Sequence, residues 1–194
     1  MRRELTARFS RSRPSPKRRS QTGNTGDLAP PTNGSKRWSC AGKSLMAMIR
    51  LPADFRDFLK LLNSHRVEYL LVGGYAVCYH GYYRNTGDMD LWIAVHRENA
   101  AKMASLIREF GFNIPEVSEE LFLQKGRIIR MGTEPVRIEI LTEISGCEFG
   151  DCYPQKVEAA LDGIPVKIIS LNDLIKNKLK SGRLKDLDDA RMLS

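Results

Sequence analysis

Asp88 and Asp90 are the residues of this chain best suited to chemistry, because they stand two positions apart in a stretch that predicts a β-strand. Side chains alternate along a strand, so both carboxylates share one face, about 7 Å apart at the backbone. Two such charges repel unless a cation lies between them. Magnesium takes one or two protein carboxylates and fills its other positions with water and substrate phosphates, so the pair favours a nucleotide-handling site. A solvated strand edge with two unrelated acids remains the alternative on this pattern alone.

A glycine pair precedes the acidic strand. The apolar run 69–72 ends at Gly73 and Gly74, and the short segment 75–81 follows. This order predicts a strand, a tight turn and a short helix. Glycine lets the backbone approach a ligand closely, and the amides at a helix start bind phosphate, so the turn is predicted to cradle a phosphate group.

A third acid comes from the strand predicted over residues 135–144. Its apolar side chains fall on one face and its charged side chains on the other, among them Glu139 and Glu143. Glu139 is the better candidate because it lies in the middle of the strand. It would complete a metal site if this strand lies beside the acidic one.

Several further elements are predicted to hold these strands in place. Apolar residues at helical spacing predict covering helices over 52–65 and 97–110, and Ser170 with Asp173 predicts the capped start of a final helical region. Shorter segments complete the pattern: a helix after Ser118, strands over 67–72, 127–131 and 165–169, a loop over 146–155 and a short helix after it. The last strand is expected at an edge of the sheet.

Cations and one histidine near these elements have open roles. Arg84 could pair with phosphate, with a carboxylate of the site, or with solvent. Lys178 continues an apolar helical stripe, so it either reaches back to water or points into a cleft. Arg183 belongs to a charged cluster that could equally be an exposed helix face. His80, on a short apolar helix, is interpreted as a packing residue rather than a catalyst.

The basic character of the chain is concentrated at its N-terminus. Residues 1–45 carry a net charge of +9, whereas the whole chain carries +8 and residues 46–194 therefore carry −1. A nucleic-acid interpretation based on charge thus applies to the tail and not to the domain. The tail is rich in Ser, Pro, Gly and Arg, so residues 1–47 are predicted to be a disordered extension and residues 48–194 to form one domain.

Three interpretations of this extension compete: a basic arm, a transit-like segment, and an upstream extension from a misassigned start codon. Met46 and Met48 stand just before the first amphipathic helix, which favours the third. No apolar stretch has the length of a signal peptide or of a membrane span, so a cytoplasmic protein with no membrane partner is expected. The four cysteines show no zinc spacing, and their thiols are expected to be reduced.

The glycine pair followed after thirteen residues by Asp88, Met89 and Asp90 resembles the signature of the DNA polymerase β-like nucleotidyltransferase superfamily. In that superfamily a strand, turn and helix carry G-[GS] and the next strand carries D-x-D. A fuller pattern over roughly residues 50–194 is similar to that of small bacterial nucleotidyltransferase-like proteins related to AbiEii-type toxins. The matching residues are Gly73, Gly74, Ala76, His80, Gly81, Arg84, Thr86, Asp88, Asp90, Arg137, Glu139, Gly146, Asn177, Lys178, Gly182, Arg183, Lys185, Asp186 and Asp189.

The resemblance implies an α+β nucleotidyltransferase fold, with a mixed β-sheet, helices packed on one side and a short C-terminal helical region. It implies transfer of a nucleoside monophosphate from a nucleoside triphosphate to an acceptor hydroxyl, with two magnesium ions as cofactors. Asp88, Asp90 and Glu139 would be the catalytic residues and metal ligands. The expected nucleotide-binding residues are Gly73, Gly74, Arg84, Thr86, Lys178 and Arg183. In the family an aspartate is commoner at the position of Glu139, so the acidic side chain of this protein is longer by one methylene group.

Family analogy offers two acceptors, the 3′ end of transfer RNA or a hydroxyl of a protein, and a cognate toxin or antitoxin as partner. Two alternatives come from other classes. The glutamate in place of aspartate favours a nucleotide-binding or antitoxin-like partner protein with weak turnover. A nucleic-acid-binding module that works through the basic arm would lose RNA binding when residues 1–45 are removed.

Overall fold

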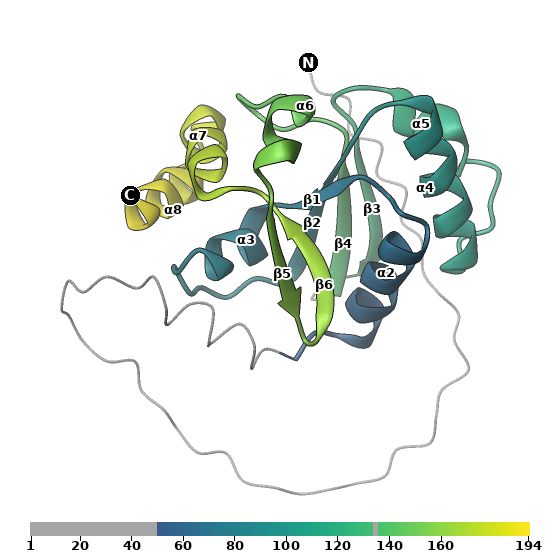
Figure 1. Ribbon diagram of the computed structural model, residues 1–194, viewed down its shortest axis with the longest axis horizontal. Coiled ribbons are helices and arrows are strands. Elements are labelled where there is room, and N and C mark those ends of the chain that lie inside the picture. Colours follow the sequence, from purple (N-terminus) through teal and green to yellow (C-terminus); the bar gives the residue numbers. More distant parts are fainter. Residues whose placement is uncertain (1–49, 134–135) are drawn as a thin grey trace, which may run out of the picture.

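The computed structural model describes residues 50–133 and 136–194, so the predicted extension over residues 1–47 lies outside the described residues. The described part forms a mixed sheet with strand order β3-β4-β2-β1-β6-β5 (Figure 1). Parallel pairs join β1 to β6 and β2 to β4, and the other neighbours are antiparallel. The expected α+β class with a mixed sheet is confirmed. The strands are β1 (Tyr69–Leu71), β2 (Asp88–Ile93), β3 (Ile128–Thr133), β4 (Val136–Leu141), β5 (Val157–Leu161) and β6 (Ile164–Ile168).

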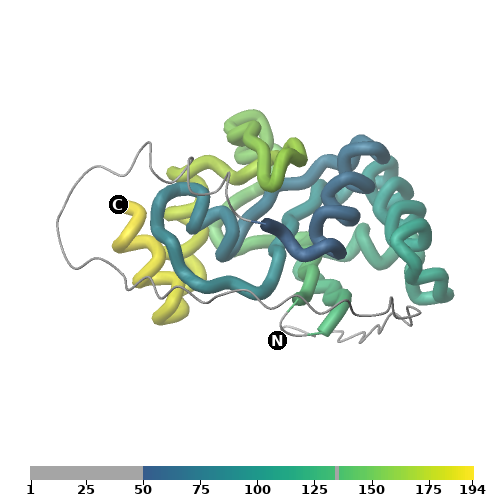
Figure 2. The backbone as a smooth tube through the Cα atoms, turned by 90° about the horizontal axis from the view of Figure 1, so that it is seen from below, coloured from purple at the N-terminus to yellow at the C-terminus, as the bar shows by residue number. Residues whose placement is uncertain are grey.

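Helices α2 (Ala53–Ser64) and α4 (Arg97–Glu109) cover one face of the sheet and lie side by side in Figure 2. The ring of Phe58 in α2 packs edge-on against Phe110, which follows α4, at 4.9 Å between centroids. Full burial of such a side chain stabilises the fold by about 1.5–3 kcal/mol. The helical stripe predicted from the sequence is confirmed as the buried face of α2, with Phe55, Phe58, Leu59 and Leu62 each inaccessible to solvent.

A buried asparagine ties the outer ends of β1 and β2 together. Asn99, in the first turn of α4, accepts a hydrogen bond from the backbone amide of Glu68 and donates to the carbonyl oxygens of Glu68 and Ala94. These two residues flank the antiparallel pair at the end away from Asp88. The hydrogen bonds satisfy backbone groups that would otherwise be buried without partners.

The segment after residue 155 differs from the prediction. The short helix expected there is wrong: these residues form β5, which turns through Asp162 and Gly163 at positive φ into β6. The prediction that β6 is an edge strand is also wrong, because β5 lies outside it. Exposed and partly buried residues alternate along β5, a period of two that fits a strand.

The predicted loop over residues 146–155 contains two short helices, α6 (Phe149–Cys152) and the 3-10 helix η1 (Tyr153–Gln155). The ring of Phe149 stands edge-on to Trp92 of β2, with 5.1 Å between centroids. Trp92 shares a strand face with Asp88 and Asp90. Part of the face that carries the acids is therefore covered by α6.

The C-terminal helices α7 (Leu171–Ser181) and α8 (Leu184–Leu193) pack together, at the end of the molecule away from α2, α4 and α5 (Glu119–Leu123) (Figures 1 and 2). The predicted cap is confirmed: the Ser170 hydroxyl accepts a hydrogen bond from the backbone amide of Asp173. Gly182, at φ 68°, ends α7 in the left-handed region that favours glycine. Among the described helices, none has the length and apolar character needed to cross a bilayer.

Candidate active site

The strand register brings the three predicted acids to one place. In the parallel ladder of β2 and β4, Asp88 pairs with Arg137 and Asp90 pairs with Glu139. On the far side of β4, Arg130 of β3 pairs with Glu139. These side chains form a charged row that crosses three strands on one face of the sheet.

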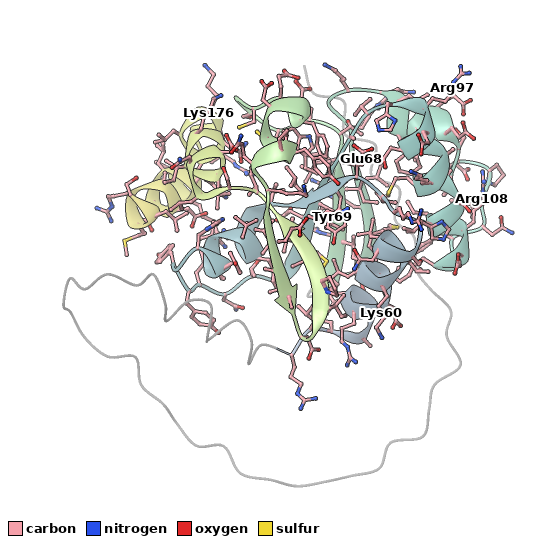
Figure 3. The ribbon with its side chains drawn as sticks, in the orientation of Figure 1. Lys60, Glu68, Tyr69, Arg97, Arg108 and Lys176 are labelled. Carbon is pink, nitrogen blue, oxygen red and sulfur yellow. The ribbon has the colours of Figure 1, made fainter. Side chains whose placement is uncertain are left out.

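A cavity of about 900 Å³ lies over this row. It is bounded by the glycine turn, by β2, β3 and β4, and by α7, whose Lys176 is labelled in Figure 3. Polar side chains predominate among its lining residues. All nine predicted site residues line it: Gly73, Gly74, Arg84, Thr86, Asp88, Asp90, Glu139, Lys178 and Arg183.

The glycine turn is closer to the acids than the sequence indicates. Helix α3 (Gly73–Tyr79) begins at Gly73 itself, two residues earlier than predicted, and Gly73 has φ +61°. A Cβ added to Gly73 would lie 1.9 Å from Oδ2 of Asp90, and one added to Gly74 would lie 2.2 Å from Oγ1 of Thr86. Both glycines are therefore required by the site's own side chains.

Asp90 has an unusual environment for a carboxylate. Burial raises its pKa to about 7, with further contributions from the negative charges of Glu139 and Asp88. The positive charge of Lys178 and a hydrogen bond from the Gly74 backbone amide act in the opposite direction. A cation bound at this position would favour the ionised form and relieve the repulsion.

The oxygen donors of Asp88 and Asp90 fit a hard divalent cation that takes most of its ligands from water and phosphate. Among residues 50–133 and 136–194, however, no three His, Cys, Asp or Glu side chains converge closely enough to hold one ion together. Glu139 lies beside Asp90 in the register but is engaged by arginines. Asp88 is likewise engaged, by Arg137, so Asp90 is the acid of the three without an arginine contact among the ion pairs described here.

Two arginines are the site residues that the sequence reasoning missed. The sequence pattern includes Arg137 only as one of the residues that match the family. Arg130 is not part of that pattern. Nη2 of Arg137 lies 2.7 Å from Oδ2 of Asp88, and Nε of Arg137 lies 3.1 Å from Oε1 of Glu139. The Arg130 guanidinium donates to the same glutamate oxygen at 2.9 Å. Arg130 stands between two apolar residues of β3, Ile129 and Met131, which are buried. This alternation of apolar and charged residues is the sequence signal that could have placed Arg130 on the polar face.

The predicted phosphate-binding cations are held by two buried aspartates of α8. Asp189 accepts hydrogen bonds from Nε and Nη2 of Arg84 at 2.7 and 3.0 Å, and its other contact is the Lys178 ammonium at 3.1 Å. Asp186 pairs with both Lys178 and Arg183. Of the two interpretations of Lys178, the second is correct: the side chain is buried at the wall of the cavity and does not reach back to water.

The pKa of Asp186 shows how strongly this network favours its charged form. Burial alone raises the pKa of the carboxyl group, but hydrogen bonds from Lys178, Ser181 and Arg183 outweigh burial and lower it below the ordinary value. Arg183 itself is largely exposed at the cavity rim. The two helices α7 and α8 are therefore joined beside the cavity by charges rather than by apolar packing.

His80 has the packing role that was predicted for it. Its Nε2 lies 2.8 Å from the carbonyl oxygen of Ile169, just after β6, and its ring stands edge-on to Tyr79. The imidazole thus ties α3 to the end of the neighbouring strand. It is not among the residues that line the cavity.

A glycine turn held over paired aspartates of the next strand, with cations on a nearby helix, defines the site of a nucleotidyltransferase. The family model described as nucleotidyl transferase of unknown function (DUF2204) matches residues 52–194. The chain therefore belongs to this nucleotidyltransferase family. No curated protein sequence matches it.

Several solved structures are similar to this chain at low sequence identity. A candidate nucleotidyltransferase (TM1012) from Thermotoga maritima is 16% identical, with a TM-score of 0.48 over 71% of this chain and 88% of that chain. The antibiotic-resistance factor ANT(2'')-Ia is 13% identical, with a TM-score of 0.47 over 78% and 83%. A nucleotidyltransferase-like antigen from Paracoccidioides brasiliensis is 16% identical, with a TM-score of 0.43 over 78% and 74%.

Proposed function

We propose that this enzyme is a magnesium-dependent nucleotidyltransferase that moves a nucleoside monophosphate from a nucleoside triphosphate to a hydroxyl group of RNA, at a transfer RNA 3′ end, or of a protein. The setting proposed is a toxin–antitoxin or phage-defence system with a cognate partner protein. The observation that supports the reaction is the direct pairing of Asp90 with Glu139 beside Asp88, beneath the turn at Gly73. The identity of the acceptor rests on the family resemblance.

Each proposed role follows from where a residue lies in the cavity. Asp88 and Asp90 would hold magnesium, which supplies positive charge to the triphosphate oxygens and lowers the barrier to their displacement. Lys178 and Arg84 stand at the cavity wall as cations for the β- and γ-phosphates, with Arg183 at the rim. The backbone at Gly73 and Gly74 leaves room for the triphosphate because neither residue has a Cβ.

The transfer is an in-line substitution at the α-phosphorus. The acceptor oxygen forms a bond to this phosphorus while the bond to the oxygen that leads to the β-phosphorus breaks, and pyrophosphate leaves. Glu139 would take the hydroxyl proton, because it is a carboxylate that lines the cavity directly beside Asp90. Positioning and charge stabilisation supply most of the rate in such reactions.

Label transfer tests the proposal directly. The full chain is incubated with magnesium, each α-labelled nucleoside triphosphate, and either total transfer RNA or the candidate partner protein. Wild type is expected to label an acceptor, Asp90→Asn to lose at least about a hundredfold in rate, and the exposed control Glu158→Gln to match wild type. The assignment fails if no acceptor is labelled or if Asp90→Asn transfers as well as wild type.

A second candidate function is a nucleotide-binding partner protein with little turnover. Its support is the engagement of Glu139 by Arg130 and Arg137, which leaves the third acid paired within the protein. Calorimetry with nucleoside triphosphates, combined with an assay for pyrophosphate, separates the two functions. Tight binding without pyrophosphate release at any acceptor favours this candidate, and sustained release rules it out.

A further inference from the structure

Arg137 bridges two of the three acids. Its guanidinium reaches Asp88 on the neighbouring strand and Glu139 two positions along its own strand, at 2.7 and 3.1 Å. The contact to Asp88 is a charge-assisted hydrogen bond, a kind about twice as strong as a neutral hydrogen bond. Arg130 adds a second guanidinium on the far side of Glu139 at 2.9 Å. Asp88 and Glu139 therefore have a positive partner supplied by the chain itself.

The positive charge occupies the same carboxylates that a shared cation would need. With two guanidinium groups and three carboxylates, the row carries a net charge of only −1 when all three carboxylates are ionised. A divalent ion and a guanidinium cannot bind the same carboxylate oxygens at full strength, because they repel each other across a few ångströms. The side chains of Arg137 and Asp88 are 25% and 35% exposed, so this bridge faces the cavity and can open without disturbing the core.

We propose that Arg137 is an internal counter-ion that competes with a divalent cation for Asp88 and Glu139. Full occupation of the site by metal then requires the guanidinium to move off these carboxylates. The displaced side chain remains in the cavity it already lines, where its charge suits a phosphate group. The inference rests on the proposed function only in its assumption that Asp88 and Glu139 bind the divalent cation. Arg137 is thus a positioning residue that sets how readily Glu139 becomes available.

Manganese binding to the full chain, without nucleotide, tests the competition. Affinity is measured by calorimetry and by the electron paramagnetic resonance signal of free Mn²⁺. Arg137→Gln is expected to bind Mn²⁺ roughly tenfold tighter or more, which is the usual effect of one nearby charge on a carboxylate. Arg127→Gln is the matched control, because Arg127 bonds Gln124 and is expected to leave the affinity unchanged.

Arg137→Lys distinguishes direct competition of the guanidinium for the carboxylates from repulsion of the metal ion by any positive charge nearby. Lysine keeps the positive charge but lacks the planar guanidinium that contacts two carboxylates at once. It is expected to give an affinity between those of wild type and Arg137→Gln. An affinity equal to wild type for Arg137→Lys, or an unchanged or weaker affinity for Arg137→Gln, overturns the proposal. Should Arg137→Gln fail to fold by circular dichroism, Arg137→Lys alone decides.

This measurement is independent of the transfer assay. Tighter Mn²⁺ binding by the Arg137 variants without label transfer by wild type would support the proposal that Arg137 is a counter-ion and reject the proposed reaction. Label transfer by wild type with unchanged Mn²⁺ binding in the variants would support the proposed reaction and reject the proposal that Arg137 is a counter-ion. No Mn²⁺ binding by wild type or by any variant overturns the counter-ion as well.

Discussion

Asp90 and Glu139 are directly paired across the parallel ladder of β2 and β4, and this pairing makes the register of the sheet part of the chemistry. The pairs on either side, Met89 with Ile138 and Leu91 with Ile140, are buried on the opposite face. A slip of one residue would move these apolar side chains to the cavity and the acids into the core. The hydrophobic core therefore fixes the position of the acids.

The raised pKa of Asp90 predicts a pH-dependent stability of the metal-free protein. The pKa is about 7 in the fold and 3.8 ordinarily, so between these values the folded chain binds more protons than the unfolded chain. Stability should therefore fall as pH rises from about 4 to about 7. Asp90→Asn removes this effect and should stabilise the protein at pH 8 by on the order of 2–4 kcal/mol, with little change at pH 4.

Urea unfolding in the presence of a chelator, at pH 4, 6 and 8, measures this difference. Glu158→Gln changes an exposed carboxylate and serves as the control. Equal stability of Asp90→Asn and wild type at pH 8 would show that the carboxylate of Asp90 is not destabilised by its surroundings.

Gly73→Ala should damage the site through the backbone and through a direct clash. Alanine is strained at φ +61°, and its Cβ would lie 1.9 Å from the Asp90 carboxylate. Strain of this kind is typically about 1–3 kcal/mol. We expect a lower melting temperature and a large loss of transfer activity. Gly150→Ala is the matched control, because its added Cβ would meet no atom within 4 Å outside its own helical turn. A Gly73→Ala variant with the melting temperature and activity of wild type would contradict the close approach seen here.

Much of the site was predictable because it depends on local periodicity. Alternation along a strand puts Asp88 with Asp90 and puts Glu139 opposite its apolar neighbours, whatever the strand order. The strand over residues 157–161 was missed although its signal is local: Asp162 and Gly163 form the two-residue turn of a hairpin, with both residues at positive φ. The interior position of β6 follows from its pairing with β5 in this hairpin.

Helix α8 shows why its charges were hard to interpret from sequence. An amphipathic helix normally buries its apolar residues. Here Asp186 and Asp189 are buried, whereas Leu184 is 87% exposed and Met192 is 52% exposed. The buried aspartates are satisfied by Lys178 and by residues from elsewhere in the chain, which a periodicity argument within α8 cannot detect. Charge pairing in three dimensions overrides the apolar pattern.

Asn99→Ala should destabilise the fold without acting on the cavity. Its side chain is fully buried and makes three hydrogen bonds to backbone groups of Glu68 and Ala94. Removing it leaves those groups unsatisfied, at about 2–4 kcal/mol in total. Thermal unfolding measures the loss, and the exposed Asn113→Ala is the control. Mn²⁺ affinity of the folded variant should equal that of wild type, and a large change in it would show coupling between the two ends of β2.

Asp189→Asn should disturb both stability and nucleotide binding. The side chain is 1% exposed and contacts Arg84 and Lys178 at once, so its neutralisation leaves two cations with less negative charge between them. Breaking a buried ion pair by removing one partner is typically destabilising by about 3–5 kcal/mol. Without the carboxylate, Arg84 and Lys178 also lose the acceptor that fixes their positions, and we expect this loss of positioning to outweigh the added positive charge and to raise the dissociation constant for ATP by roughly tenfold.

Urea unfolding and calorimetry with ATP check both effects of Asp189→Asn. The control is Asp188→Asn, whose carboxylate is about half exposed, pairs with Arg191 and accepts a hydrogen bond from the Tyr82 hydroxyl. Asp188→Asn should change stability by less than about 1 kcal/mol and leave ATP affinity unchanged. If Asp189→Asn loses stability but binds ATP as wild type does, the aspartate only holds α8 in place. In that case Asp189 does not position Arg84 and Lys178 for binding the phosphates.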